Sequence, residues 1–409
     1  MKHRVAITGL GIVSSLGNTT GAVATALYRG RSGIVVDPER EARGFLSPLT
    51  GRIDNFTPAF PLSRKQRKTM PDFAEWAAEA AFQALAQANL APEDLRNEAS
   101  GIIFGCDSSC IAAIEQVEGL AASGMTTSLG SGQVFRSMTS CVSMNLNVIL
   151  QTRGACWTLS GACASGGHAV GQAADLIRLG RQDRVICGGA QEINWQSMCS
   201  FDGLGAFSTR IHAAHEASRP FDASRDGLVP GGGAAAVLLE RYDLAKARGA
   251  AILGEVAGYG FSSDGENISV PSADGLGRAM RSALRDAGMA APDISYVCAH
   301  ATSTPVGDAM EARNLLDLFG DNGVPVSSTK SMTGHELWMS GAAQVVYTCL
   351  MAGHGFTAAN RNFTEGDDIT ARLAVIRETL ETPPRTALCN AAGFGGTNSC
   401  LALAFHGKS

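Results

Sequence analysis

The sequence predicts an α/β protein built from two similar halves, because short apolar strands alternate with amphipathic helices and one helix ending occurs twice. The chain has 409 residues, a length that suggests two domains or two halves rather than one small core. Apolar residues make up 45% of the chain and charged residues 17%, as in well-packed globular proteins. We therefore expect layers of helices and of largely parallel or mixed strands.

Six apolar runs and four longer amphipathic stretches form this alternation. The predicted strands are residues 5–7, 101–104, 184–187, 234–239, 296–300 and 386–390. The predicted helices are residues 71–90, 165–179, 276–288 and 341–351. In the third helix one face is apolar, formed by Leu276, Met280, Ala283 and Leu284 at helical spacing.

The repeated helix ending indicates a duplication. Residues 84–95 and residues 283–294 both carry a helix stop and then Ala-Pro with an acidic residue, and an apolar strand follows each. We expect the boundary between the halves after a short helix at residues 244–248. The predicted halves are therefore residues 1–250 and residues 251–409.

Charge, hydropathy and cysteine usage limit the function classes. The net charge of −5 argues against non-specific binding of nucleic acid, which needs a basic face. Neither an apolar run of about 18 residues nor a stretch of signal-peptide type is found, so we expect no membrane span and no secretion. The eleven cysteines are scattered and include no CxxC pair, which favours free thiols in a reducing cytoplasm and disfavours zinc.

Cys163 is the candidate nucleophile, on a turn of small residues between an apolar strand (155–159) and a predicted helix. A helix N-terminus favours the thiolate, and small neighbours let a substrate approach the sulfur. The alternative for any single cysteine is a buried structural thiol, but this setting distinguishes Cys163 from Cys141 or Cys349. His168, in the following helix, is interpreted as structural.

Two histidines occupy comparable positions in the second half. His300 ends a predicted strand, and His335 follows a polar turn and precedes an apolar helix. Either residue alone is usually a hydrogen-bonded core histidine, and the ordinary role of Asp308 and Glu311 is to cap the helix after His300. A Gly-rich turn at residues 390–398 offers backbone N–H groups to an oxyanion, or is tight packing alone.

Together with residues 5–14, 221–227 and 263–265, these four motifs resemble the β-ketoacyl-acyl carrier protein synthases, most closely the synthase I type. The resemblance covers nearly the whole chain. It implies the thiolase fold, in which two similar halves each contain a five-stranded mixed sheet between helices, layered α-β-α-β-α. It also implies a 3-oxoacyl-[acyl-carrier-protein] synthase, an acyltransferase that condenses malonyl-carrier protein with an acyl group and releases CO2.

The resemblance assigns roles residue by residue. Cys163 holds the acyl group, and His300 and His335 hydrogen-bond the malonyl thioester and stabilise its enolate. Lys330, Glu311 and Asp308 support these residues, and the backbone N–H groups of Cys163 and Ala392 hold the oxyanion. The implied substrate-binding residues are Thr302 and Thr304 for the phosphopantetheine arm, with Met138, Ala391, Ala392 and Trp338. Substrates arrive on carrier protein, and no metal or redox cofactor is implied.

Two segments depart from the family pattern. The family usually has Asn-Ser-Phe-Gly-Phe where this chain has Asn-Ala-Ala-Gly-Phe at residues 390–394, so the phenylalanine that gates the acyl pocket is missing. Trp338 and Met339 stand where Gly and Ala are usual. We hypothesise that these changes together reshape one pocket for a rigid, unsaturated or aryl acyl chain, as in aryl-polyene or polyketide synthesis. The alternative is an ordinary fatty-acid elongation enzyme.

The expected partners follow from the same resemblance. Arg64, Lys65 and Lys68 match a basic dock for an acidic carrier protein, although a solvated charge run is the alternative. The chain is expected to form a homodimer, or to be the active subunit of a heterodimer with a chain-length-factor-like protein. A thiolase is disfavoured because no second cysteine lies at residues 391–398.

Overall fold

The computed structural model describes residues 2–406, whose main strands form two sets with the same order. The first set runs β1-β7-β6-β4-β5, and the second runs β8-β13-β12-β9-β10. The first set is β1 (Val5–Val13), β4 (Ser100–Gly105), β5 (Cys156–Leu159), β6 (Arg184–Gln191) and β7 (Gly233–Arg241). The second is β8 (Gly254–Ser263), β9 (Tyr296–Cys298), β10 (Pro325–Ser327), β12 (Thr386–Gly393) and β13 (Thr397–Ala404).

Strand directions repeat as well as strand order. In each set the first two pairings are antiparallel and the last two are parallel. A short antiparallel contact between β1 and β8 joins the two sets, and β11 (Ala374–Val375) extends the second beyond β10. A separate small sheet pairs β2 (Ile34–Val36) with β3 (Leu49–Gly51). The predicted fold of two similar five-stranded halves is confirmed.

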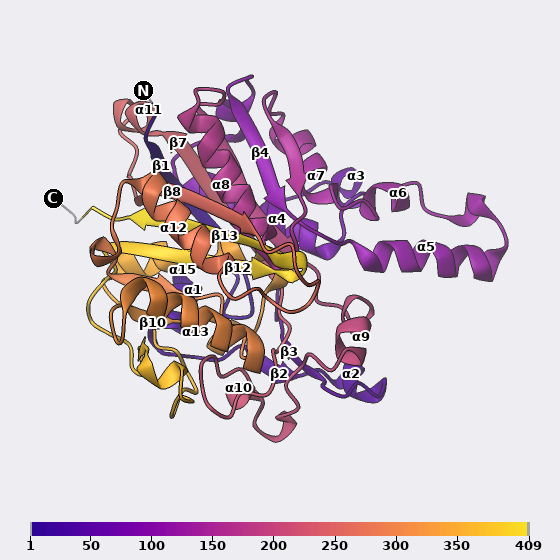
Figure 1. The fold of residues 1–409 in the computed structure, drawn as a ribbon. Coiled ribbons are helices and arrows are strands. Elements are labelled where there is room, and N and C mark those ends of the chain that lie inside the picture. The colour runs from indigo at the N-terminus through magenta and orange to yellow at the C-terminus, as the bar shows by residue number, and fades with distance from the viewer. Residues whose placement is uncertain (1, 407–409) are drawn as a thin grey trace.

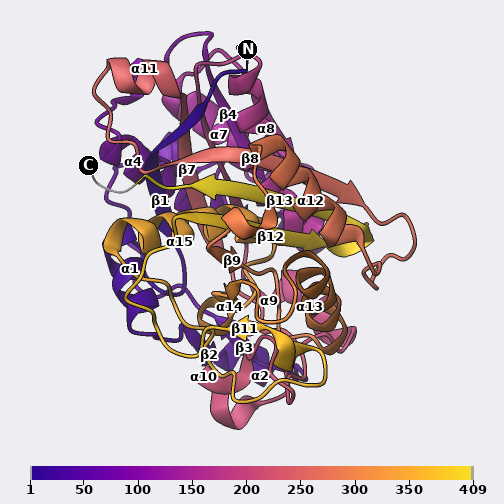
Figure 2. The ribbon, with the colours of Figure 1, turned by 60° about the vertical axis from the view of Figure 1, so that its left-hand side comes forward.

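Helices separate and cover the strand sets (Figures 1 and 2). The central helices α8 (Ser165–Arg178) and α15 (Ser340–His354) pack on each other and on strands of both sets. On the outer faces, α4 (Asp72–Gln87) packs on β1 and β7, and α12 (Gly275–Ala287) packs on β8 and β13. Residues 340–351 of α15 are all buried, because this helix lies between two layers.

The remaining helices connect these layers. They are α1 (Thr20–Tyr28), α2 (Pro38–Ala42), α3 (Arg64–Arg67), α5 (Cys110–Ser123), α6 (Gln133–Arg136), α7 (Cys141–Leu150), α9 (Trp195–Gly203), α10 (Ala214–Ala217), α11 (Tyr242–Ala247), α13 (Pro305–Phe319) and α14 (Lys330–Thr333). Figure 1 shows α5 and α6 as an arm that extends away from the body of the protein. We call residues 110–136 the arm.

The repeated helix ending has the same geometry in both halves. After α4, the carboxylate of Asp94 accepts the N–H of Ala91 at 2.8 Å, and after α12 that of Asp293 accepts the N–H of Ala290 at 2.8 Å. Each ending leads into a buried strand, β4 or β9. The predicted boundary at residue 250 lies in the segment between β7 and β8, and it stays a prediction.

The predicted strands and helices are present, with one instructive difference. The strand predicted to reach His300 ends at Cys298, because the backbone N–H groups of His300 and Ala301 donate to the carboxylate of Glu311 instead of a strand. The eleven cysteines are all free thiols. Within residues 2–406, no helix is both long and apolar enough to cross a membrane.

Candidate active site

Cys163 lies on a strained turn between β5 and α8. Ala162 has a φ of 45°, in the left-handed region that non-glycine residues rarely adopt, and it begins a 3₁₀ turn that contains Cys163. The Oγ of Ser165 fixes this turn, because it accepts the N–H of Gly161 at 2.9 Å and donates to the carbonyl of Ala162 at 2.6 Å. The small residues of this segment therefore form a turn that directs the cysteine to one position.

The thiol of Cys163 is buried, with 6% of the residue exposed. Burial raises its pKa to about 12, although the ammonium of Lys330 opposes this shift. The carboxylate of Asp107 raises the pKa further, whereas the backbone N–H of Phe394 stabilises the sulfur anion. Desolvation of the thiolate thus outweighs the stabilisation that a helix start gives it. Cys163 is therefore a neutral thiol that loses its proton as it reacts.

Glu311 and Asp308 hold the segment that carries His300. Glu311 accepts the N–H of His300 at 2.9 Å, the N–H of Ala301 at 2.6 Å and the side-chain amide of Asn390 at 2.9 Å. It therefore ties the histidine to β12 and does more than cap α13.

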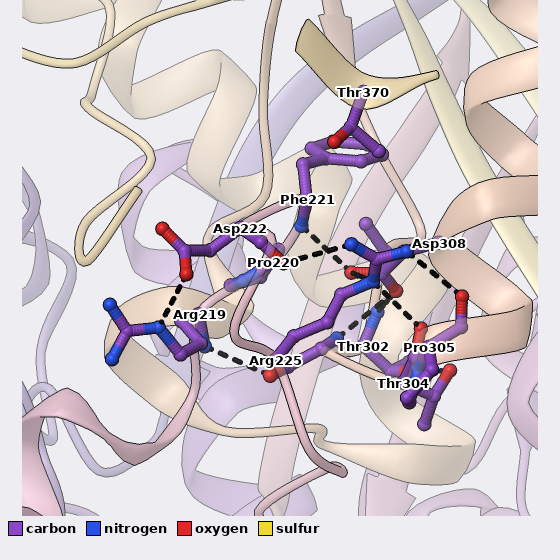
Figure 3. A network of polar contacts seen from close by, with 12 residues as sticks. Arg219, Pro220, Phe221, Asp222, Arg225, Thr302, Thr304, Pro305, Asp308 and Thr370 are labelled. Carbon is purple, nitrogen blue, oxygen red and sulfur yellow. Dashed lines mark hydrogen bonds and ion pairs between the residues drawn. The ribbon is translucent and has the colours of Figure 1, made fainter. Parts of the chain in front are cut away.

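Asp308 performs the same task one turn earlier in α13. One oxygen accepts the backbone N–H groups of Thr302 and Ser303, and the other accepts that of Phe221. Arg225 donates to the carbonyls of Thr304 and Pro305, so this network, drawn in Figure 3, joins residues 219–225 to the segment after His300. Burial raises the pKa of Asp308 to about 7.

His335 is placed by backbone hydrogen bonds to a neighbouring strand-like segment. Its N–H donates to the carbonyl of Val229 at 2.6 Å, and its carbonyl accepts the N–H of Gly231 at 2.8 Å. Gly334, with a φ of 73°, makes the turn that this arrangement requires. The imidazoles of His300 and His335 lie edge to face, with ring centroids 5.2 Å apart.

Both imidazoles are neutral in this environment. Burial and the nearby ammonium of Lys330 lower the pKa of His300 and of His335 well below the ordinary value. Among the described residues, neither Nδ1 atom has a hydrogen-bond partner, and neither has the Nζ of Lys330. Burial also lowers the pKa of Lys330. Within the described residues, these three polar atoms are therefore buried at the site without a hydrogen bond.

A cavity of about 310 Å³ brings the predicted residues of both halves together. Cys163, His300 and His335 line it, and so do Glu311 and Ala392. Thr302 and Thr304 also line it, with their hydroxyls 3.2 Å apart. The wall is otherwise largely apolar and includes Phe201, Leu228, Ile268, Val306, Met310 and Phe394. The cavity therefore suits a long ligand with a few polar groups.

Other predicted residues lie outside the lining of this cavity. Ala391 is buried and points towards Gly341 of α15, since neighbouring residues of a strand face opposite sides. Trp338 is buried in a cluster with Cys163, and its Nε1 donates to the Oγ of Ser108 at 3.2 Å. Met138 is 40% exposed near the base of the arm. Arg64, Lys65 and Lys68 are exposed on and beside α3, where Arg67 joins them.

Several contacts at the site carry no strong sequence signal. Phe207, Phe201 and Phe394 form a stack of nearly parallel rings, with centroids 6.3 Å and 6.2 Å apart. The first two come from loop and helix positions that only the fold brings together. His168 is hydrogen-bonded to Tyr259 at 2.7 Å and to Thr397 at 2.8 Å, in agreement with a structural role. The part of the chain that the structure describes contains no cluster suited to a metal ion.

A thiolase-type fold with a buried cysteine and two neutral histidines in one cavity defines a class of condensing enzyme. Models of the beta-ketoacyl synthase N-terminal and C-terminal domains match residues 2–245 and 253–364. The 3-oxoacyl-[acyl-carrier-protein] synthase 1 of Escherichia coli (strain K12) is 38% identical over 98% of both chains. The chain belongs to the beta-ketoacyl synthase family, which confirms the predicted family and its condensing acyltransferase class.

Two solved structures extend this finding. A beta-ketoacyl synthase from Burkholderia phymatum STM815 is 35% identical and superposes with a TM-score of 0.94, covering 99% of this chain and 100% of that one. The ishigamide ketosynthase/chain length factor is 30% identical, with a TM-score of 0.91 and full coverage of both chains. The chain is thus similar both to a beta-ketoacyl synthase and to a chain of a ketosynthase/chain length factor.

Proposed function

We propose that this protein condenses an acyl group held on Cys163 with malonyl-carrier protein, using His300 and His335. The observation that carries the proposal is the shared cavity, in which the thiol and two neutral imidazoles meet. The relatives that carry acyl-carrier protein in their names support carrier-bound substrates. The groups described at the site suffice for this chemistry without a further cofactor.

The first half-reaction loads the enzyme. The sulfur of Cys163 attacks the acyl thioester, a new carbon–sulfur bond forms, and the phosphopantetheine thiol leaves with the proton of the cysteine. Backbone N–H groups of Cys163 and Ala392 hold the oxyanion of the tetrahedral intermediate. Thr302 and Thr304 bind the phosphopantetheine arm along the cavity.

The second half-reaction forms the carbon–carbon bond. The bond between the malonyl carbon and its carboxylate breaks, CO2 leaves, and the electron pair becomes an enolate on the thioester. Neutral His300 and His335 donate hydrogen bonds to that oxygen, and the ammonium of Lys330 favours its negative charge. The enolate carbon then attacks the acyl carbonyl and expels the sulfur of Cys163 as a thiolate, which takes up a proton from water to regenerate the thiol.

Ala392 and Trp338 bear on which acyl groups the enzyme accepts. Ala392 lines the cavity without the bulk of the gating phenylalanine. Trp338 lies outside the lining, packed in the Cys163 cluster behind it, and Ser108 holds its indole by a hydrogen bond. We infer a pocket fixed in one shape, which favours rigid polyenoyl or aryl chains over saturated ones. Equal elongation of octanoyl and octatrienoyl carrier protein by the purified enzyme would exclude this selectivity.

A second subunit is expected on the face that carries β5 and the arm. The outer edge of β5 has no strand partner within residues 2–406. Exposed apolar residues of the arm and of the segments beside β5 are Val117, Leu120, Met125, Val134, Phe135, Met138, Val148 and Trp157. We propose that a like subunit or a chain-length-factor-like protein covers them, and that Met138 reaches a substrate only across that interface. Co-expression with a cysteine-less relative and sizing of the complex distinguish the two partners.

The condensation itself is tested with wild type, His300→Ala and His335→Ala. Each protein is loaded with acyl-carrier protein, then given malonyl-carrier protein, and both CO2 and the 3-oxoacyl product are measured. We expect both variants to accept the acyl group, and to release CO2 about 10²–10³ times more slowly. Normal CO2 release by both variants would refute the roles of the two histidines.

A cytoplasmic location stays a prediction, which the eleven free thiols support.

A further inference from the structure

Glu192 is a buried carboxylate directly after β6, and the condensation described above gives it no role. Only 2% of the residue is exposed. Its Oε1 accepts the N–H of Cys110 at 2.6 Å and the hydroxyl of Ser108 at 3.3 Å. Its Oε2 accepts the N–H of Ile111 at 3.3 Å and the side-chain amide of Asn194 at 2.9 Å. Four donors therefore hold this carboxylate in one place.

The hydroxyl of Ser108 connects Glu192 to Trp338. The indole Nε1 of Trp338 donates to the Oγ of Ser108 at 3.2 Å, and the same hydroxyl donates to Glu192. An indole N–H can only donate and a carboxylate can only accept, so the direction of both hydrogen bonds is fixed. The three side chains form one chain of hydrogen bonds, Trp338 to Ser108 to Glu192, which we call the indole anchor.

Trp338 packs directly behind the cavity. Its 3₁₀ turn, Leu337–Met339, contacts the turn Ala162–Ala164 that carries Cys163. Trp338 is 7% exposed and lies in one buried cluster with Cys163 and Leu228, both of which line the cavity. The orientation of the indole therefore decides where this part of the cavity wall stands.

We propose that Glu192 is a positioning residue that sets the acyl selectivity, because it holds Trp338 in one orientation through Ser108. This inference rests on the proposed function and deepens its selectivity. A wall that cannot move accepts a rigid conjugated chain without further loss, whereas a saturated chain must give up rotation about its C–C bonds to fit. When the indole is released, the wall adapts to the saturated chain and the discrimination falls.

Glu192 has a structural role as well, which the experiment must separate from the indole anchor. The N–H groups of Cys110 and Ile111 that it accepts begin α5, the first helix of the arm. Asn194 caps α9, because its Oδ1 accepts the N–H of Ser197 at 2.9 Å. Loss of these contacts lowers stability, but only loss of the indole anchor changes which acyl group is preferred.

The experiment measures kcat/KM for elongation of octatrienoyl and of octanoyl carrier protein, and the ratio of the first value to the second is the readout. Ser108→Ala removes the acceptor of the indole N–H. Glu192→Asp withdraws the carboxylate from Ser108 and retains its charge. We expect each variant to lower the ratio by about threefold or more, as loss of one net hydrogen bond does. An unchanged ratio in either variant overturns the proposal.

Asn194→Ser is the matched control. It removes one donor from the same carboxylate, on the oxygen that does not face Ser108, and a serine still caps α9. This variant should keep the wild-type ratio, because the indole anchor is intact. An equal fall of the ratio in Asn194→Ser and Glu192→Asp would show that general loosening around Glu192 changes the selectivity, and it would overturn the proposal.

A second comparison uses Trp338→Phe, which has no N–H to donate. In this background Ser108→Ala and Glu192→Asp should leave the ratio unchanged. A further fall would show that both residues act without Trp338, against the proposal. A wild-type enzyme that elongates neither carrier protein would refute the proposed function itself, whereas a selective wild type whose ratio both variants retain would overturn this inference alone.

Discussion

Ala162 and Leu337 share a left-handed backbone conformation, with φ of 45° and 44°, one residue before Cys163 and Trp338. Each begins a 3₁₀ turn, and a serine with φ of −51° and ψ of −49° then leads into α8 or α15. The two turns also contact each other. The duplication therefore places the nucleophile of the first half and the tryptophan of the second at matching positions beside one another.

The conformation of Ala162 makes the turn sensitive to branching at Cβ. Ala162→Val should lower the free energy of unfolding by about 1–3 kcal/mol, because a β-branched residue is strained at this φ. Ala162→Gly accepts the same conformation without strain and serves as the matched variant. Denaturant unfolding of both proteins checks the prediction. Equal stability of the two variants would show that the turn relaxes freely.

Because His300 and His335 are neutral, we expect the rate of malonyl decarboxylation not to decline as the pH falls to 6. An ordinary imidazole gains a proton near pH 6.5, but the pKa values of His300 and His335 lie well below that. The form that donates to the enolate therefore persists as the pH falls. Malonyl decarboxylation by Cys163→Ala should be as fast at pH 6 as at pH 7.5. A decline centred near pH 6.5 would contradict this assignment.

His168 predicts a pH dependence of stability rather than of activity. Burial lowers its pKa to about 4, so the unfolded chain binds a proton below pH 6.5 that the native protein does not. Stability is thus lost as the pH falls from the unfolded towards the native pKa. Between pH 7.5 and pH 5, the free energy of unfolding of His168→Gln should fall by about 2 kcal/mol less than that of wild type. Urea unfolding at both pH values measures this difference. Equal losses of stability in wild type and His168→Gln would show that another group causes the acid sensitivity.

Substitution of Glu311 should lower both the stability of the protein and the rate of CO2 release. A glutamine at 311 offers one accepting oxygen where the carboxylate uses two, so the N–H of His300 or of Ala301 loses its partner. Glu311→Gln should lower the free energy of unfolding by about 1–3 kcal/mol and slow CO2 release. The exposed Glu98→Gln is the control for the same chemical change. Unchanged kinetics would separate Glu311 from the placement of His300.

The basic segment beside α3 predicts a salt-dependent effect on carrier-protein use alone. Charge reversal at Arg64, Lys65 and Lys68 should raise KM for acyl-carrier protein by about tenfold or more at low salt. Elongation of the same acyl group on free pantetheine should not change. A matched reversal on α12 supplies the control, at Arg278, Arg281 and Arg285. Equal effects of both reversals would indicate that net charge alone is responsible.

Local patterns predicted most of the fold because the strands are short apolar runs bounded by clear stops. Three strands of the second set were not predicted, residues 254–263, 325–327 and 397–404. The Gly-rich turn before the last of them obscures its start. Of the site, Cys163, His300 and His335 could be found from their strand–turn–helix settings. The rings of Phe201 and Phe207 could not, because only the folded chain brings them beside Phe394.

The most direct test of the account is intact-mass spectrometry after incubation with a panel of acyl-carrier proteins and then with malonyl-carrier protein. We expect an acyl adduct on wild type and none on Cys163→Ala, with a product two carbons longer after malonyl-carrier protein is added. An adduct on the variant as well, or an adduct on wild type that malonyl-carrier protein does not discharge, would contradict the assignment of Cys163 as the condensing nucleophile.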